Sequence, residues 1–247
     1  DIALDSTQMD DEMKTHVMAM LKKQFEKEYE LGFNSSESIY KEVEKLDAPS
    51  PSNMGDMQFQ VAFSGEADIL YKNIKENRYV NQNEMFSKEF LILDELEKSD
   101  WQLEKGTKNI GEYTCFKATF KRMATVSTSI RTIKEGDDSM PSDEKEAEQT
   151  ITAWYTPQIP LAHGPSMYGG LPGLILEVSD GEETILCSKI ILNPNNGVDI
   201  KEPKKGKKLS QAQYDAIMEK KMKEMDEQFN SNDENQDGER IEIRIGG

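Results

Sequence analysis

The chain has 247 residues, enough for one large β domain or two small ones. Its 47 acidic and 30 basic residues give a net charge of −17, which argues against nucleic acid and against an anionic membrane surface as partners. No apolar run approaches the roughly 20 residues of a membrane-spanning helix. We therefore expect a protein that does not span a membrane and whose charge keeps it soluble by self-repulsion.

The chain opens with an amphipathic segment. Residues 1–28 are predicted to contain a helix, because Met9, Met13, Val17 and Phe25 recur at helical spacing. Acidic residues near its start suit the positive end of the helix dipole. The pattern indicates one helix at the N-terminal end.

Residues 29–192 are predicted to form an antiparallel β domain. Apolar or alternating runs are separated by turn residues about every ten positions, which is the rhythm of an antiparallel sheet. The fold class is therefore mainly β, within α+β, with a curved antiparallel sheet or an open barrel and a helix at each end of the chain. The expected strands cover residues 29–33, 38–46, 68–73, 78–82, 86–93, 100–103, 113–121, 152–155, 174–178 and 184–192.

An acidic segment interrupts this rhythm. Residues 132–150 contain seven acidic residues against two lysines and almost nothing to bury. Such a composition cannot contribute a packed core. We expect a mobile insertion there.

The C-terminal part is predicted as three pieces. A basic linker with five lysines in residues 201–208 leads into a helix, so that linker and helix together span residues 193–229. Ser210 and Gln213 have the spacing of a capping box at the start of that helix. Residues 230–247 form an acidic tail that could end in a short strand.

A loop rich in proline and glycine separates the strands expected at residues 152–155 and 174–178. Pro157 and Pro160 remove amide donors and end the first strand. Leu171-Pro172-Gly173 has the composition of a tight turn, with Gly173 at positive φ. Because apolar residues flank each of these breakers, the loop is predicted to be ordered.

This stretch resembles a known family. Residues 170–175 spell GLPGLI, residues 154–160 read WYTPQIP, and a Gly-Pro pair follows at residues 164–165. Together with shorter matches that extend the similarity over about residues 29–192, these motifs are similar to the GLPGLI family of secreted Bacteroidota proteins. The signature residues are Trp154, Tyr155, Pro157, Pro160, Gly164, Pro165, Gly170, Leu171, Pro172 and Gly173.

The resemblance implies a cellular location more than a mechanism, because this family has no established activity. It implies a periplasmic or secreted protein whose signal peptide has been removed. Glycines and prolines in a fixed order usually report backbone geometry, so we predict a structural role for the signature. His163, which lies inside it, is expected to pack on a proline or a tyrosine.

Cys115 and Cys187 are the only cysteines, and both fall in expected strands. An exported chain meets an oxidising compartment, which favours a disulfide between them. Two separate buried thiols are the alternative. A catalytic thiol is disfavoured, because nothing nearby in the sequence lowers the thiol pKa.

No cofactor is expected, apart from a possible calcium ion. Asp233, Asn235 and Asp237 place oxygen ligands as the first half of a calcium-binding loop does, but Arg244 stands where that loop needs a bidentate Glu. A solvated acidic tail is the simpler interpretation.

Two short motifs suggest modification. Ser6 and Ser139 each lie in a D-S/T-apolar pattern that resembles the O-glycosylation site of Bacteroidota. Chance alone would produce about one such match in a chain this acidic. Both serines lie in segments expected to be exposed.

The sequence favours a non-enzymatic protein without excluding an enzyme, because no common catalytic or phosphate-binding motif occurs. The leading hypothesis is a cell-envelope binding or accessory protein that presents a β scaffold to a protein, peptide or lipid ligand. One alternative is a hydrolase that acts on envelope peptide or glycan through acidic residues. The other is a structural subunit of an outer-membrane-associated complex.

Overall fold

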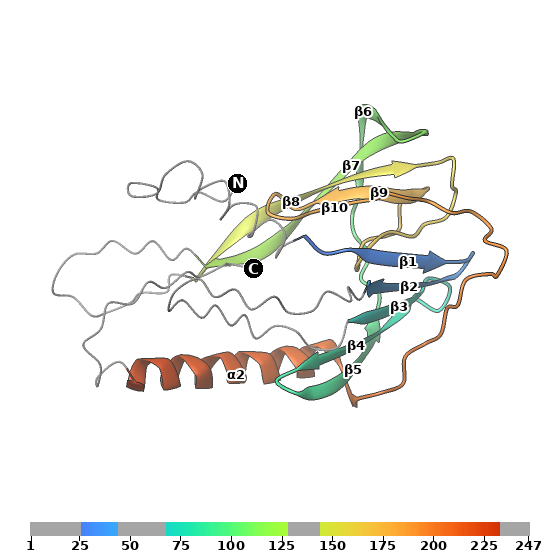
Figure 1. Ribbon diagram of the computed structural model, residues 1–247. Helices are drawn as coiled ribbons and strands as arrows, with labels where there is room; N and C mark the ends of the chain where they lie inside the picture. The colour runs from blue at the N-terminus through green and yellow to red at the C-terminus, as the bar shows by residue number, and fades with distance from the viewer. Residues whose placement is uncertain (1–25, 44–67, 128–143, 233–247) are drawn as a thin grey trace, which may run out of the picture.

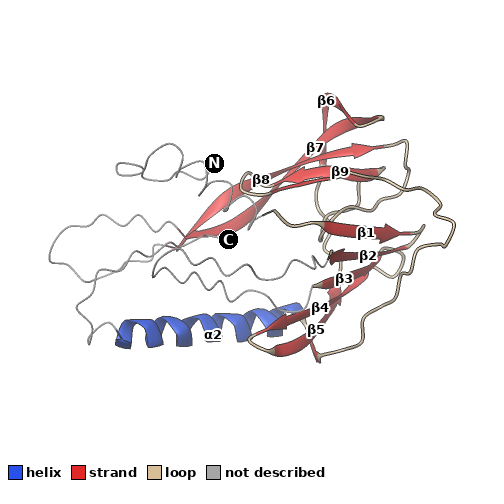
Figure 2. Cartoon of the chain, in the orientation of Figure 1, coloured by secondary structure: helices blue, strands red, loops and turns tan. Residues whose placement is uncertain are grey.

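The structure is a computed structural model that describes residues 26–43, 68–127 and 144–232. Within these ranges the chain forms eleven strands and one helix, so the fold is mostly β (Figure 2). The elements are β1 Tyr29–Phe33, β2 Glu37–Glu42, β3 Ile69–Asn73, β4 Arg78–Met85, β5 Lys88–Glu95, β6 Gln102–Ile110, β7 Tyr113–Ser127, β8 Glu144–Thr156, β9 Leu174–Ser179, β10 Thr184–Leu186, β11 Lys207–Leu209 and α2 Gln211–Asn232.

The strands form two sheets, which lie as two layers in Figure 1. Sheet A has the order β1-β2-β3-β4-β5-β11, and all its pairs are antiparallel except β11 with β5. Sheet B has the order β10-β9-β8-β7-β6 and is antiparallel throughout. Its strands β7 and β8 form a hairpin that extends past the ends of their neighbours.

The structure confirms a mainly β fold and corrects its architecture. Instead of one curved sheet or open barrel, the described strands form two separate sheets. The predicted mobile insertion was wrong for residues 144–150, because Glu144 already begins β8 and its neighbours pair with β7. The insertion's residues 132–143 and the predicted N-terminal helix up to residue 25 lie outside the described residues.

Alternation along the strands gives sheet A an inner face, which meets sheet B and α2, and an outer face. On the inner face Tyr40, Leu70, Tyr79 and Ile92 form a buried cluster. Leu31 packs against this cluster and also against a cluster of sheet B, so it joins the two layers. The sheet B cluster consists of Cys115, Leu174 and Leu176 together with Ile159 of the loop between β8 and β9. A separate cluster on the outer face of sheet A contains Tyr71, Val80 and Leu91.

Helix α2 begins with the predicted capping box. Ser210 N donates to Gln213 Oε1 at 3.0 Å, and Gln213 N donates to Ser210 Oγ at 3.3 Å. The first turn is fixed to sheet A, where Tyr214 packs edge-on against Phe90. Further along, the helix leaves the sheets, and Met222 is 52% exposed. No helix among the described residues is both long and apolar enough to cross a membrane.

Candidate functional site

The loop of residues 157–173, here called the signature loop, joins β8 to β9 and encloses a buried lysine of the opposite sheet. Lys72 of β3 is 2% exposed, and its Nζ donates to the carbonyl oxygens of Gly164, Ser166 and Tyr168 at 2.9, 2.5 and 2.9 Å. Burial lowers the pKa of Lys72 to about 7, while the three oxygens favour the charged ammonium. All three donors of the ammonium are used. We call these three oxygens the carbonyl cage.

His163 fixes the same loop to the first hairpin. Its Nε2 donates to the carbonyl oxygen of Asn34 at 2.9 Å, and its ring packs against Phe33. Burial lowers the pKa of His163 to about 4, so the ring is neutral at pH 7. The loop is also held from sheet B, because Trp101 Nε1 donates to the Gly169 carbonyl at 2.9 Å.

Two glycines make the geometry of the loop possible, for different reasons. Gly170 has a φ of +84°, a conformation that favours glycine. The prediction of positive φ at Gly173 was wrong. Gly173 is instead required by close approach, because a Cβ there would lie 2.2 Å from the carbonyl oxygen of Thr156. The signature therefore packs one piece of backbone directly against another.

The other signature residues surround this loop. Tyr155 and Leu171 are buried in one cluster of sheet B, and Trp154 packs on the other face of that sheet. Lys108 Nζ lies 4.5 Å from the centre of a Trp154 ring and pairs with Glu177 at 2.6 Å. Of the prolines, Pro165 is buried, while Pro157, Pro160 and Pro172 are exposed.

The predicted disulfide is absent, and Cys115 and Cys187 are free thiols that contribute to one apolar cluster. Cys115 lies on β7, and Cys187 follows β10, so β8 and β9 separate them in the sheet. The two residues thus come from different segments of the chain and meet the same cluster without being bonded. Burial raises the pKa of both thiols, which disfavours a reactive thiolate.

A second polar group of residues lies at the other end of the inner face of sheet A. Tyr29 of β1 pairs with Glu42 of β2, and Asn83 of β4 pairs with Phe90 of β5. Asp68 directly precedes β3, whose first residue, Ile69, pairs with Lys41 on one side and with Gln82 on the other. If this register continues by one residue, Asp68 lies between Glu42 and Asn83. The polar rim is defined as Tyr29, Tyr40, Glu42, Asp68 and Asn83.

The floor of the polar rim contains buried atoms without hydrogen-bond partners. These are the hydroxyl of Tyr40 and the Oδ1 of Asn83, together with the Oδ1 of Asn81 in the adjoining row. Tyr40 and Asn83 are each 8% exposed, whereas Tyr29 above them is 39% exposed. Unpaired buried acceptors of this kind each cost stability, on the order of 1–3 kcal/mol. A ligand that donates hydrogen bonds would satisfy them.

The charges around the polar rim are mostly negative. Burial raises the pKa of Tyr29, and the nearby carboxylates of Glu42, Asp68 and Glu183 raise it further. Burial likewise raises the pKa of Asp68, although its side chain is partly open to solvent. Lys27 is the nearby cation and pairs with Glu42 at 3.0 Å. The rings of Tyr29 and Tyr40 stack with centroids 4.9 Å apart.

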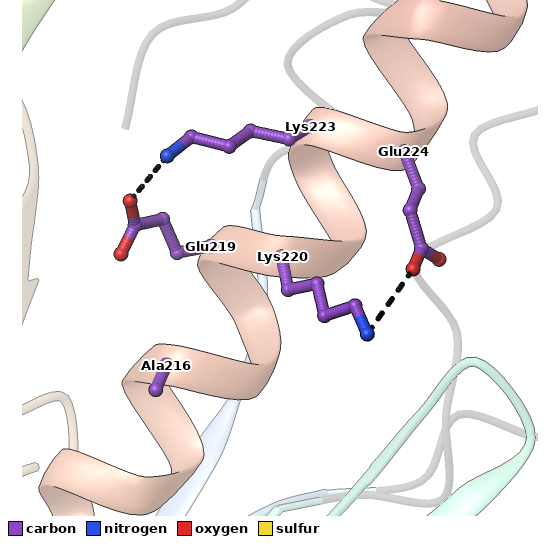
Figure 3. Close-up of a pocket in the computed structure, with 5 residues that line it drawn as sticks. All are labelled: Ala216, Glu219, Lys220, Lys223 and Glu224. Carbon is purple, nitrogen blue, oxygen red and sulfur yellow. Dashed lines mark hydrogen bonds and ion pairs between the residues drawn. The ribbon is translucent and has the colours of Figure 1, made fainter.

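A depression along α2 offers no comparable feature (Figure 3). Lys223 pairs with Glu219 at 2.7 Å, and Lys220 lies 3.9 Å from Glu224, so its charged groups pair along their own helix. Such exposed pairs are worth little. We do not assign a site there.

Several predicted site residues lie outside the described residues. These are the calcium candidates Asp233, Asn235 and Asp237 and the glycosylation candidates Ser6 and Ser139. Within the described ranges, no group of three or more His, Cys, Asp or Glu side chains is arranged to hold a metal ion.

Comparisons with known proteins give partial matches. Residues 101–177 match a family model described as "Protein of unknown function (Porph_ging)". No curated protein matches the chain. A solved structure, "Structure of PNGF-II in C2 space group", aligns with a TM-score of 0.46 at 18% identity. That alignment covers 78% of this chain and only 29% of the other, and a similarity this weak supports no functional statement. The matched family segment contains the whole GLPGLI motif, so the chain is similar to a family of unknown function through the signature loop and the strands before it.

Proposed function

We propose that this protein is a non-enzymatic binding or accessory protein of the cell envelope, which holds a ligand at the polar rim. One observation carries the proposal: buried hydrogen-bonding atoms of Tyr40 and Asn83 have no partner, and they lie below a partly exposed ring and carboxylate. Native proteins rarely leave such groups unpaired without a reason. A bound ligand is a reason that also explains why three of the unpaired atoms, those of Tyr40, Asn81 and Asn83, lie in two adjoining rows of one face.

The signature loop supports the proposal because its carbonyl oxygens and one nitrogen of His163 are bound within the protein, although the Nδ1 of His163 is buried without a partner. Its carbonyl oxygens bind Lys72, and the Nε2 of His163 binds the backbone of the first hairpin. The loop thus holds sheet A against sheet B and keeps the inner face in position. Its role in the proposal is to support the binding face.

Membership of the GLPGLI family and export to the periplasm or outside are part of the proposal. The GLPGLI motif at residues 170–175 lies within the segment that matches the family model of unknown function. Fractionating the native host, with immunodetection of the protein, tests the location. We expect the protein in the osmotic-shock or culture fraction. Its retention with cytoplasmic enzymes would contradict export.

The alternatives gain less support. A hydrolase would need a pair of carboxyl groups, at least one with a raised pKa, across a cleft. Asp68 is the described carboxyl whose pKa is raised, and the other resolved carboxyl shifts are downward. A structural subunit could use the exposed part of α2, but no described contact indicates what would cover it.

Native mass spectrometry of protein isolated from the host envelope tests the binding function. We expect a bound ligand on the wild type and its loss from Asn83→Leu, which replaces an unpaired amide by an apolar group. Asn109→Leu is the matched control, because Asn109 is exposed on β6. A second variant, Tyr40→Phe, keeps the test informative if Asn83→Leu unfolds. The proposal is contradicted if the same adduct persists in all variants, or if the wild type carries none.

A further inference from the structure

The chemistry of the polar rim indicates which ligand class it would take. This step rests on the proposed function and concerns the same residues. The unpaired buried atoms at the rim and the adjoining row are two amide oxygens, which can only accept, and one hydroxyl; the Nδ2 of Asn83 already donates to the Tyr214 hydroxyl. Their partner must donate hydrogen bonds.

The charges add a second requirement. From sheet A the rim is faced by Glu42 and Asp68, and the turn between β9 and β10 contributes Glu183, whose carboxylate also raises the pKa of Tyr40. Helix α2 contributes Asp215, which acts on Tyr214 beside Asn83. The cation at the rim is Lys27, and Glu42 already pairs with it.

Asp68 is a carboxylate of the rim without a direct partner. No hydrogen bond or ion pair to its side chain is found within the described residues, and the positive charge that acts on it is that of Lys27. A carboxylate partly removed from water gains most from a cation that also donates a hydrogen bond. Asp68 therefore favours a positively charged donor next to Asn83.

The aromatic rings at the rim also favour a cationic ligand. Tyr29 and Tyr40 stack at an interplanar angle of 8°, and Tyr29 remains 39% exposed. The electron-rich face of such a ring attracts ammonium and guanidinium groups. Donor capacity, positive charge and affinity for an aromatic face are combined in these two groups.

We propose that the polar rim binds an ammonium or guanidinium group, with Asp68 as its counter-ion and the Oδ1 of Asn83 as its hydrogen-bond acceptor. A lysine or arginine side chain of a peptide and a polyamine both carry this chemistry. The net charge of −17 would attract either one over a distance and favour its arrival.

Isothermal titration calorimetry at low salt tests this inference with three probes: a trilysine peptide, the same peptide with acetylated side chains, and spermidine. We expect trilysine to bind and the acetylated peptide to bind at least tenfold more weakly. Asp68→Asn should weaken trilysine binding on the order of fivefold. The matched control is Glu148→Gln, which removes one charge from the exposed end of the β7–β8 hairpin. It should change the affinity by less than about twofold, because salt screens distant charges.

The outcomes separate the ligand class from the binding function. Tighter binding of trilysine than of spermidine supports a peptide ligand, and equal binding supports a small polyamine. If the acetylated peptide binds as well as trilysine and Asn83→Leu abolishes both, the cationic class is overturned while the binding function stands. If Asp68→Asn and Glu148→Gln weaken binding equally, the attraction is only that of the net charge, which also overturns the inference. If none of the probes binds, the cationic class is overturned, while the binding function is decided separately by native mass spectrometry of the protein from the host envelope.

Discussion

The two ends of the inner face of sheet A differ in how their central buried polar groups are paired. At one end, every donor of the Lys72 ammonium reaches an oxygen of the carbonyl cage. At the other end, the hydroxyl of Tyr40 and the Oδ1 of Asn83 are buried without a partner. The sheet is the same and the burial is similar, so the difference lies in whether the chain supplies the partner.

This difference separates architecture from function. A fully paired buried network holds a fold in one arrangement, whereas a partly paired one costs stability unless something else completes it. The carbonyl cage belongs to the first kind and the polar rim to the second. Beside the cage, Ser38 Oγ and His163 Nδ1 are also buried without a partner. Each variant below tests whether a residue has the structural or the ligand-binding role that we assign to it.

The largest effect is expected at Gly173. Replacing it with alanine would place a Cβ 2.2 Å from the carbonyl oxygen of Thr156, so Gly173→Ala should cost more than about 4 kcal/mol or prevent folding. Gly170→Ala is the control, because a Cβ there meets nothing within 4 Å and costs only the strain of a positive φ, about 1–2 kcal/mol. Urea unfolding measures both. Equal costs would contradict the close-approach explanation.

Lys72→Met should be the next most damaging. It leaves three buried carbonyl oxygens without their donor, and we expect a loss of roughly 3–5 kcal/mol in the free energy of unfolding. Lys75→Met removes the same group from an exposed turn and should change stability by less than about 0.5 kcal/mol. A stability for Lys72→Met close to that of the wild type would show that the cage does not hold the sheets together.

His163 predicts a pH dependence. Its folded pKa of about 4 lies below the ordinary value of 6.5, so between these values the unfolded chain binds more protons. The stability contributed by neutral His163 is complete above pH 6.5 and is lost as the pH falls toward 4, on the order of 3 kcal/mol in all. His163→Gln, which can still donate to the Asn34 carbonyl, should lose this component. Parallel pH–stability curves for both proteins would refute the assignment.

The smallest effects should distinguish two tyrosines on the same face. The Tyr79 hydroxyl donates to Gln211 Oε1 at 2.8 Å, whereas the Tyr40 hydroxyl has no partner. Tyr79→Phe should therefore cost about 1 kcal/mol, and Tyr40→Phe should be neutral or stabilise slightly in the absence of ligand. Thermal unfolding compares the pair. A larger loss for Tyr40→Phe would mean that its hydroxyl is already satisfied.

Local signals in the sequence predicted the local structure well. A turn joins the strands expected at residues 29–33 and 38–46, with Asn34 Oδ1 accepting from the backbone amides of Ser36 and Glu37 at 2.8 Å. The capping box of α2 was predicted from two residues and is present. Both features depend on side chains that bind their own backbone within three residues, so the sequence contains all the partners.

The two ends of sheet A could not be predicted in the same way. Nothing around Lys72 indicates that its ammonium meets a loop more than ninety residues later. The polar rim combines residues of four strand segments, and a change of register by one residue would move each of them to the other face. For Gly173, the sequence indicated a special position but could not distinguish a positive φ from a close approach.

The most direct test of the central claim is an amide NMR titration of the protein with the trilysine peptide. It reports on the signature loop and the polar rim in one experiment. We predict that the signals of Tyr29, Tyr40, Asp68 and Asn83 shift with saturation, while those of residues 163–173 stay in place. Shifts concentrated in residues 163–173, with the rim unchanged, would contradict the account, because the loop would then be the binding site and the rim a part of the scaffold.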